Sequence, residues 1–157
     1  MVLMLALVAS SGIANAATKS ATTQLSADFE VVAPCTVSGS WDTQPLTAGN
    51  YPAGDAQLGR LTLTYDGCGG RGERLYFEGT DKDGSGRTLA TGPRGQTLAV
   101  GPVTGPLWNK TPDGTWYSFG NVNGGSGTMA TVLTNSDQWD AQPGDYSLTL
   151  DIGLFVL

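Results

Sequence analysis

The chain has 157 residues, a formal net charge of −6, 23 glycines and no histidine. Its acidity argues against binding nucleic acid or anionic lipid, because both require a basic surface. Without histidine the chain lacks the commonest general base and the commonest metal ligand, so we expect no enzyme activity, no metal site and no cofactor.

Residues 1–16 are predicted to be a signal peptide. Residues 3–9 are apolar, and Ala14-Asn15-Ala16 matches the small-x-small pattern that precedes cleavage, here before Ala17. No basic residue precedes the apolar run, which indicates a start inside a longer leader. The run is shorter than the ~20 residues that a membrane span needs. We therefore expect export without membrane insertion.

Residues 22–32 alternate strictly between two kinds of side chain. One face consists of Thr23, Leu25, Ala27, Phe29 and Val31. The other face consists of Gln24, Ser26, Asp28 and Glu30. A period of two predicts a strand with one buried face. This apolar face must pack either into the chain's own fold or into that of a neighbouring molecule.

The remainder of the chain consists of short β-rich runs between turn signals. The predicted strands, including the first, are 22–32, 35–41, 57–65, 73–79, 87–91, 96–100, 115–119, 127–134 and 145–157. Such a pattern predicts an all-β antiparallel sandwich or barrel. Residues 81–86 (DKDGSG) have the look of a calcium loop but lack the other ligands of one, so we expect a hairpin turn.

The predicted last strand has an apolar face and no charged residue after it to protect its edge. That face consists of Tyr146, Leu148, Leu150, Ile152, Leu154 and Val156. An exposed apolar edge strand promotes association unless something covers it. The chain thus has an apolar strand near each end.

Two cysteines, Cys35 and Cys68, are expected to form a disulfide, because an even number of cysteines is typical of exported domains. The alternative, a redox or metal pair, has neither CxxC spacing nor a histidine in its favour. Trp41, Trp108, Trp116, Tyr117 and Trp139 are expected mainly to pack the sandwich, with a receptor-binding aromatic patch as the alternative.

These features, in this order, resemble subunits of chaperone–usher fimbriae, and most of all the Dr/Afa adhesins and aggregative adherence fimbriae. The resemblance rests on the alternating segment before Cys35, the Cys35–Cys68 pair, the region from Trp108 to Tyr117, and the ending PGDYSLTL. In that ending Gly144 is fourteenth from the C-terminus, where such subunits have a glycine at the start of their last strand. Aggregative subunits are often basic, whereas this chain is acidic.

The resemblance implies an incomplete immunoglobulin-like β-sandwich with six strands and a seventh that another molecule donates. Residues 17–33 would be the donor extension and residues 34–157 the domain. The donor side chains would be Thr23, Leu25, Ala27, Phe29 and Val31. The acceptor groove would be formed by Gly144, Tyr146, Leu148, Leu150, Ile152, Leu154 and Val156.

The partners that the resemblance implies are copies of the same chain, a periplasmic chaperone and an outer-membrane usher. The chain would be exported through the periplasm to a fimbrium on the bacterial surface and would adhere to a host glycoprotein or matrix protein. The alternative is a self-contained secreted β-sandwich, such as a lectin, whose N-terminal strand folds back into its own sheet. No residue is assigned to receptor contact.

Overall fold

The structure, a computed structural model, describes residues 21–29, 31, 34–68, 72–103, 105–122 and 125–156. The chain divides into two units, Met1–Val31 and Val32–Leu157, which are described separately. No helix occurs in the residues that the structure describes. Accordingly, that part of the chain contains no helix able to cross a membrane.

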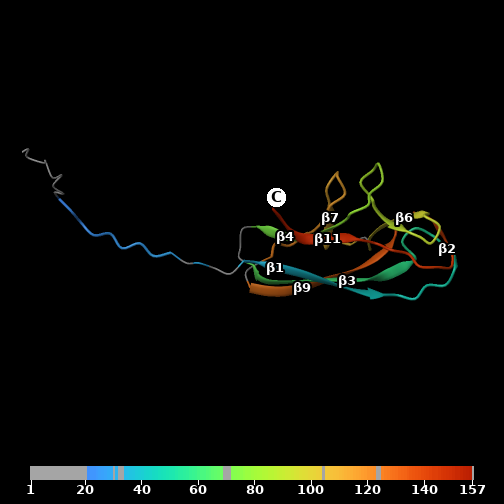
Figure 1. The fold of residues 1–157 in the computed structure, drawn as a ribbon, viewed down its shortest axis with the longest axis horizontal. Helices are drawn as coiled ribbons and strands as arrows, with labels where there is room; N and C mark the ends of the chain where they lie inside the picture. Colours follow the sequence, from blue (N-terminus) through green and yellow to red (C-terminus); the bar gives the residue numbers. More distant parts are fainter. Residues whose placement is uncertain are drawn as a thin grey trace, which may run out of the picture. The chain divides into compact units, whose positions relative to one another are not determined.

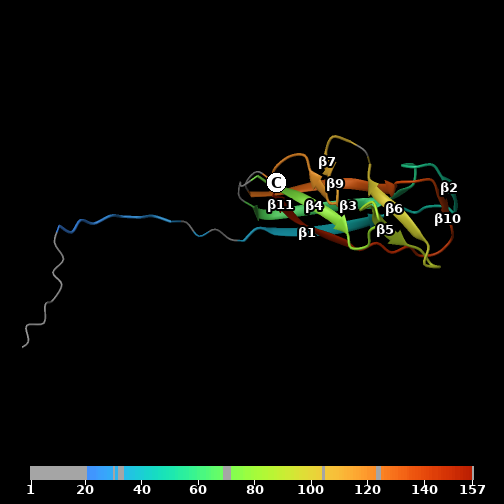
Figure 2. The same ribbon diagram turned by 90° about the horizontal axis from the view of Figure 1, so that it is seen from above.

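The second unit is built from two antiparallel sheets that form two layers (Figure 1). The first sheet has the order β1 (Thr36–Thr43), β3 (Gln57–Cys68), β9 (Gly125–Asn135), β6 (Thr97–Pro102) and β5 (Thr88–Thr91). The second has the order β11 (Leu150–Val156), β4 (Glu73–Gly79), β8 (Trp116–Ser118) and β7 (Trp108–Lys110). A separate pair joins β10 (Trp139–Ala141) to β2 (Gly49–Tyr51), and Figure 2 shows β5 beside β6. The strands β1 and β11 each lie at an edge.

The main core lies between the two sheets and follows from the alternation of side chains along the strands. On β3, Leu61 and Leu63 are buried, whereas Thr64, which follows Leu63 and points to the opposite face, is exposed. On β4, Leu75 and Phe77 are buried in the same way, and the Phe77 ring meets Trp108 edge to face at 4.9 Å. Each such side chain contributes about 1.5–3 kcal/mol when it leaves water.

Most predicted strands are confirmed, with β4 matching residues 73–79 and the others shifted by a few residues. Three strands were missed: β2, β7 and β10. Each has three residues, too few to display a period of two.

The last strand was predicted to begin at residue 145, but β11 begins at Leu150. Ser147 instead exchanges backbone hydrogen bonds of 2.9 and 2.8 Å with Thr91 of β5, in the other sheet. The chain therefore passes from one sheet to the other before Leu150. The alternation of apolar and polar side chains continues through this change, so the sequence pattern does not reveal it. Residues 21–29 and 31 form no strand, because a strand needs a hydrogen-bonded neighbour and these residues have none within the described chain.

The predicted disulfide is present in the structure and joins Cys35 to Cys68, with 4.4 Å between their Cα atoms. It connects the chain just before β1 to the end of β3. These two strands already pair from Thr36↔Asp66 to Thr43↔Gly59. The bond thus fastens the edge strand β1 to its neighbour β3.

Asn135 at the end of β9 organises the loop between β2 and β3. Its side chain is fully buried and accepts a hydrogen bond of 2.8 Å from the backbone N–H of Ala56. Its amide nitrogen donates to the carbonyls of Pro52 and Asp137 at 2.7 and 2.8 Å. Buried polar groups must be satisfied in this way to be tolerated.

The turn at residues 81–86 is a hairpin turn, as predicted, and the Asp83 carboxylate makes hydrogen bonds within it. Asp83 accepts hydrogen bonds from the backbone N–H groups of Ser85 and Arg87, both at 2.9 Å, and pairs with the Arg87 guanidinium at 2.6 Å. Arg87 also reaches Asp137 at 2.6 Å. No group of three potential metal ligands is found in the described residues.

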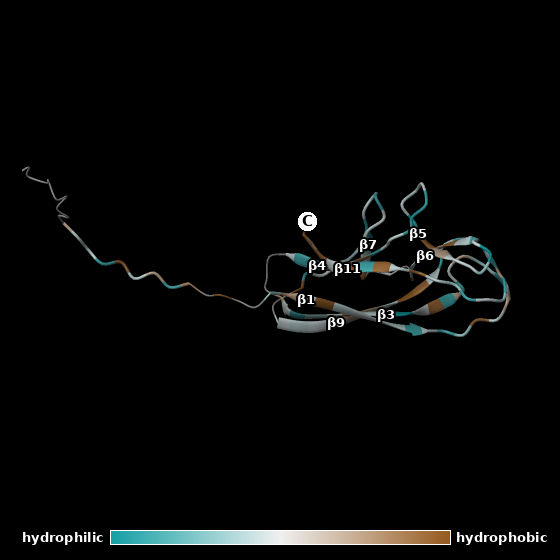
Figure 3. Cartoon of the chain, in the orientation of Figure 1, coloured by the Kyte–Doolittle hydropathy of each residue, from teal (hydrophilic) through white to brown (hydrophobic). Residues whose placement is uncertain are grey.

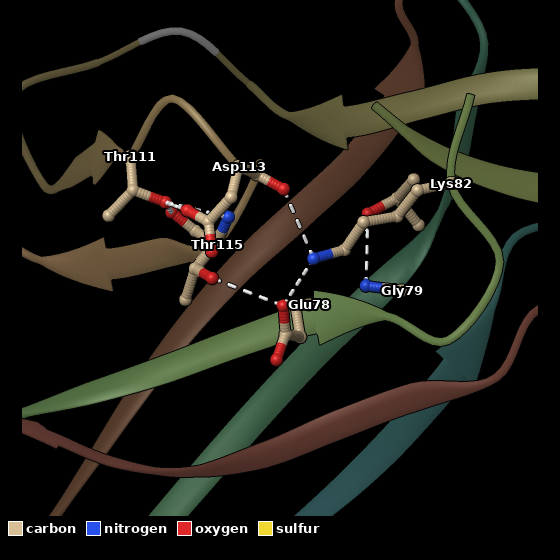
Figure 4. A network of polar contacts seen from close by, with 7 residues as sticks. Glu78, Gly79, Lys82, Thr111, Asp113 and Thr115 are labelled. Atoms are coloured by element: carbon tan, nitrogen blue, oxygen red, sulfur yellow. Dashed lines mark hydrogen bonds and ion pairs between the residues drawn. The ribbon is translucent and has the colours of Figure 1, made fainter. Parts of the chain in front are cut away.

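A second polar network ties this turn to the hairpin between β7 and β8 (Figure 4). Lys82 pairs with Glu78 and donates a hydrogen bond of 3.2 Å to the backbone carbonyl of Asp113. Glu78 also accepts a hydrogen bond of 3.1 Å from the hydroxyl of Thr115. The network connects the end of β4 to the turn at residues 81–86 and to the loop between β7 and β8.

Two carboxyl groups of these turns have lowered pKa values. The pKa of Asp83 lies below its ordinary value chiefly because the backbone N–H of Arg87 bonds its ionised form. The pKa of Asp113 is lowered chiefly by the hydroxyl of Thr111. Asp113 is exposed, so solvent screens its contribution to stability, whereas Asp83 is half-buried.

We predict that Asn135→Ala lowers the free energy of unfolding by roughly 2–4 kcal/mol, because it leaves buried donors and acceptors unsatisfied. Urea unfolding followed by tryptophan fluorescence measures the change. Asn50→Ala, at an exposed position of β2, is the matched control and should cost well under half as much. Equal losses in the two variants would contradict this role of Asn135.

We predict that Asp83→Asn destabilises the chain near neutral pH but not in acid. A lowered native pKa gives stability that is present above the unfolded pKa of 3.8 and is lost as the pH falls through the native pKa. Urea midpoints measured from about pH 6 to about pH 2.5 should therefore converge for wild type and variant. Asp81→Asn, whose carboxylate makes no hydrogen bond within the described chain, should show no such convergence; a constant gap for Asp83→Asn would refute the prediction.

Candidate functional site

The candidate site is a groove between two strand edges that lack partners. β1 pairs only with β3, and β11 pairs only with β4, from Leu150↔Gly79 to Val156↔Glu73. Within the residues that the structure covers, no strand bonds to the other edge of either. Such edges present rows of free N–H and C=O groups that can template a further strand.

The groove has a volume of about 790 Å³ and an apolar interior. One wall is β1 with the segment 44–48 that follows it. The other wall is the segment 141–148 with the first part of β11, and the floor includes Leu58, Leu61, Ala90 and Leu98. Leu148, Leu150 and Ile152 line the groove and remain only partly buried.

Two glycines shape the β1 side of the groove. A Cβ at Gly39 would lie 2.8 Å from the Cδ1 atom of Ile152, so this glycine lets β1 and β11 approach closely. A Cβ at Gly59 would lie 2.2 Å from the indole of Trp41, so the indole occupies the space that a side chain there would take. Trp41 is nevertheless 40 % exposed, because the groove beside it is open.

Aromatic side chains close the end of the groove that lies beyond Leu148. The ring of Tyr146 meets Trp139 edge to face at 5.2 Å, and Trp139 stacks on Tyr51 at 5.9 Å. The Tyr146 hydroxyl accepts hydrogen bonds from the Gln96 side chain and the Gln142 backbone, both at 3.3 Å. Tyr146 is therefore held in place as a fixed part of the wall.

The predicted groove residues fall into three groups. Those that line the groove are Gly144, Tyr146, Leu148, Leu150 and Ile152. Leu154 packs against the main core instead, and Val156 is 64 % exposed at the end of β11. On the opposite face of β11, Phe155 stacks on Tyr117 at 5.4 Å.

The β1 wall was not predicted. Val37, Gly39 and Trp41 alternate with small polar residues, so the signal for an inward face was present. Nothing local indicates that this face lies opposite Ile152, some hundred residues later. Of the other aromatic residues, Trp108 is buried, and Trp116 packs against the same core.

The first unit carries the other candidate residues. Leu25, Phe29 and Val31 are 90 %, 89 % and 85 % exposed, and Thr23 and Ala27 are exposed as well. Figure 3 shows hydrophobic residues recurring along this segment. Large exposed apolar patches are typical of protein–protein interaction sites, so this segment is a candidate binding surface.

No protein-family model matches the chain, and no curated protein sequence matches it. Solved structures of similar fold include a pilus subunit and an adhesin. One is HdaB, the minor tip subunit of the Escherichia coli Hda pilus, with a TM-score of 0.54 and 10 % identity over 77 % of this chain and 84 % of that one. The other is the Salmonella SafD adhesin, with a TM-score of 0.51 and 12 % identity over 78 % of this chain and 98 % of that one.

At these identities the likeness establishes the fold. The chain is an all-β, incomplete immunoglobulin-like sandwich, as the sequence predicted. The finer resemblance to the Dr/Afa and aggregative fimbriae stays a prediction.

Proposed function

We propose that the chain is a structural, non-enzymatic subunit of a surface fimbria that polymerises by donor-strand exchange. Residues 1–16 would be removed on export, residues 17–33 would be the donor extension, and residues 34–157 would form the acceptor domain. Thr23, Leu25, Ala27, Phe29 and Val31 of one molecule would fill the groove of the next. In the simplest filament the next molecule is a further copy of this chain.

The observation that supports this proposal most is the groove itself, an apolar channel flanked by two free strand edges. An added strand there would bond to both β1 and β11 while its apolar face entered the groove. This is β-strand addition, in which backbone bonds supply affinity and alternate side chains supply specificity.

The exposed alternating segment has the features that such a groove requires. Four apolar positions from Leu25 to Val31 recur every second residue, or about every 6.8 Å along a strand. Ala27 has the smallest of these side chains and would fit the narrow part of the groove, where Gly39 and Ile152 lie close together. Burial of Leu25, Phe29 and Val31 would contribute on the order of 5–9 kcal/mol.

A head-to-tail contact of this kind does not close on itself and therefore generates a filament. The assembly would need a periplasmic chaperone to cover the groove before exchange and an outer-membrane usher, as the family resemblance implies. The two pilus and adhesin structures of similar fold support a fimbrial role. Adhesion to a host glycoprotein or matrix protein is part of the proposal, with no receptor residue assigned.

We predict that deleting residues 17–32 abolishes polymerisation, because the donor is removed and the acceptor groove is left intact. Chaperone capture of the truncated chain should persist in a periplasmic co-expression experiment, since it uses the groove alone. Fibres of ordinary length from the truncated chain would refute donor-strand exchange. A stable monomeric full-length chain with its N-terminal segment folded into its own sheet would favour the lectin-like alternative.

We predict that Phe29→Asp shortens or prevents fibres, because it removes an apolar side chain from the joint and places a charge in the groove. Loss of the burial alone weakens the joint by about tenfold to a hundredfold. Gln24→Asp adds the same charge to the polar face and serves as the control. Sedimentation and electron microscopy of purified fibres measure the difference, and equal fibre lengths for the two variants would count against the assignment of faces.

A further inference from the structure

Both walls of the groove carry acidic residues and no basic ones. Along residues 34–48 the one charged residue is Asp42, and along residues 139–156 the charged residues are Asp140, Asp145 and Asp151. All four are exposed. Asp42, Asp145 and Asp151 take part in no ion pair within the described part of the chain. The rim of the groove is therefore uniformly negative.

Asp42 and Asp151 are direct sequence neighbours of residues that line the groove, one on β1 and one on β11. Asp42 follows Trp41, and Asp151 lies between Leu150 and Ile152, so each belongs to the outward face of a strand whose inward neighbours line the groove. Side chains directly opposite on neighbouring strands are about 5 Å apart. Outward side chains of a bound strand would thus lie next to carboxylates on both sides. The nearest basic residue in the β1 ladder, Arg60, pairs in register with Asp42 on the side away from the groove and forms no ion pair with it.

The chain's own donor segment matches the groove in shape but not in charge. Its outward positions, Gln24, Ser26, Asp28 and Glu30, include two acidic residues and no basic one. In a joint between two copies of this chain, acidic residues of the donor would face an acidic rim. Like charges opposite each other across a sheet are destabilising.

We infer that the groove prefers a strand from a different protein, with an apolar inward face and lysine or arginine at its outward positions, over this chain's own residues 22–32. The inference rests on the proposed function and specifies the partner of the same site. The apolar face supplies most of the affinity for either strand, and the outward charges choose between them. Salt screens exposed charges, so we expect the preference to be strong at low ionic strength and to disappear at high ionic strength.

Two fluorescein-labelled peptides test the inference. One has the sequence of residues 22–32, and the other carries Asp28→Lys and Glu30→Lys with an unchanged apolar face. The acceptor is the full-length chain with Phe29→Asp, which keeps its own donor out of the groove. Fluorescence anisotropy titrations at about 20 mM and about 1 M salt should show the basic peptide binding roughly tenfold more tightly at low salt, with the difference closing at high salt.

Variants of the acceptor locate the effect. Asp42→Asn combined with Asp151→Asn should remove the preference, whereas Asp55→Asn, which lies between β2 and β3 and belongs to neither wall, should keep it. Equal binding of the two peptides at low salt, or tighter binding of the native sequence, overturns this inference but leaves donor-strand exchange standing. Failure of both peptides to bind at either salt concentration overturns the inference and the proposed function together.

Discussion

β1 and β11 each have one edge without a strand partner in the described chain, and this is the main physical constraint on the sandwich. Their backbone groups lack partners in the described chain, and the side chains between them are only partly buried. Leu148 is one of these partly buried side chains. It packs against the main core and also against a smaller cluster formed by Ala90, Leu98 and Val100. A sandwich that ends in this way has an incomplete core, and an added strand would satisfy the backbone and cover the core in one step.

Separate contacts tie each wall of the groove to the rest of the sandwich. On the β1 side, the Cys35–Cys68 disulfide fastens the edge strand to β3, while Gly39 and Gly59 shape the interior. On the other side, Tyr146 is fixed by two hydrogen bonds and by Trp139. Such contacts fix the groove walls before any partner binds, and a preformed site lowers the entropy cost of binding.

Affinity and partner choice have separate physical origins in such a joint. Apolar burial and ladder hydrogen bonds are available to any strand with the right alternation, so they distinguish poorly between donors. Charges at the rim contribute less energy, but they differ from one donor to another and therefore decide among them. The acidic outward positions of residues 22–32 and the acidic rim of the groove are the basis of our inference that the preferred neighbour is a different protein.

Local patterns in the sequence predicted most of the strands and the inward face of β3, because side-chain direction alternates along any strand. They also indicated the disulfide, since an even number of cysteines is typical of exported domains. The tertiary structure alone decided that β11 starts at Leu150, that Gly39 and Trp41 form the second wall, and that Asp42 and Asp151 are sequence neighbours of residues that line the same groove. Those facts depend on which distant strands become neighbours, and pairing between residues a hundred positions apart leaves no trace in the local alternation of either one.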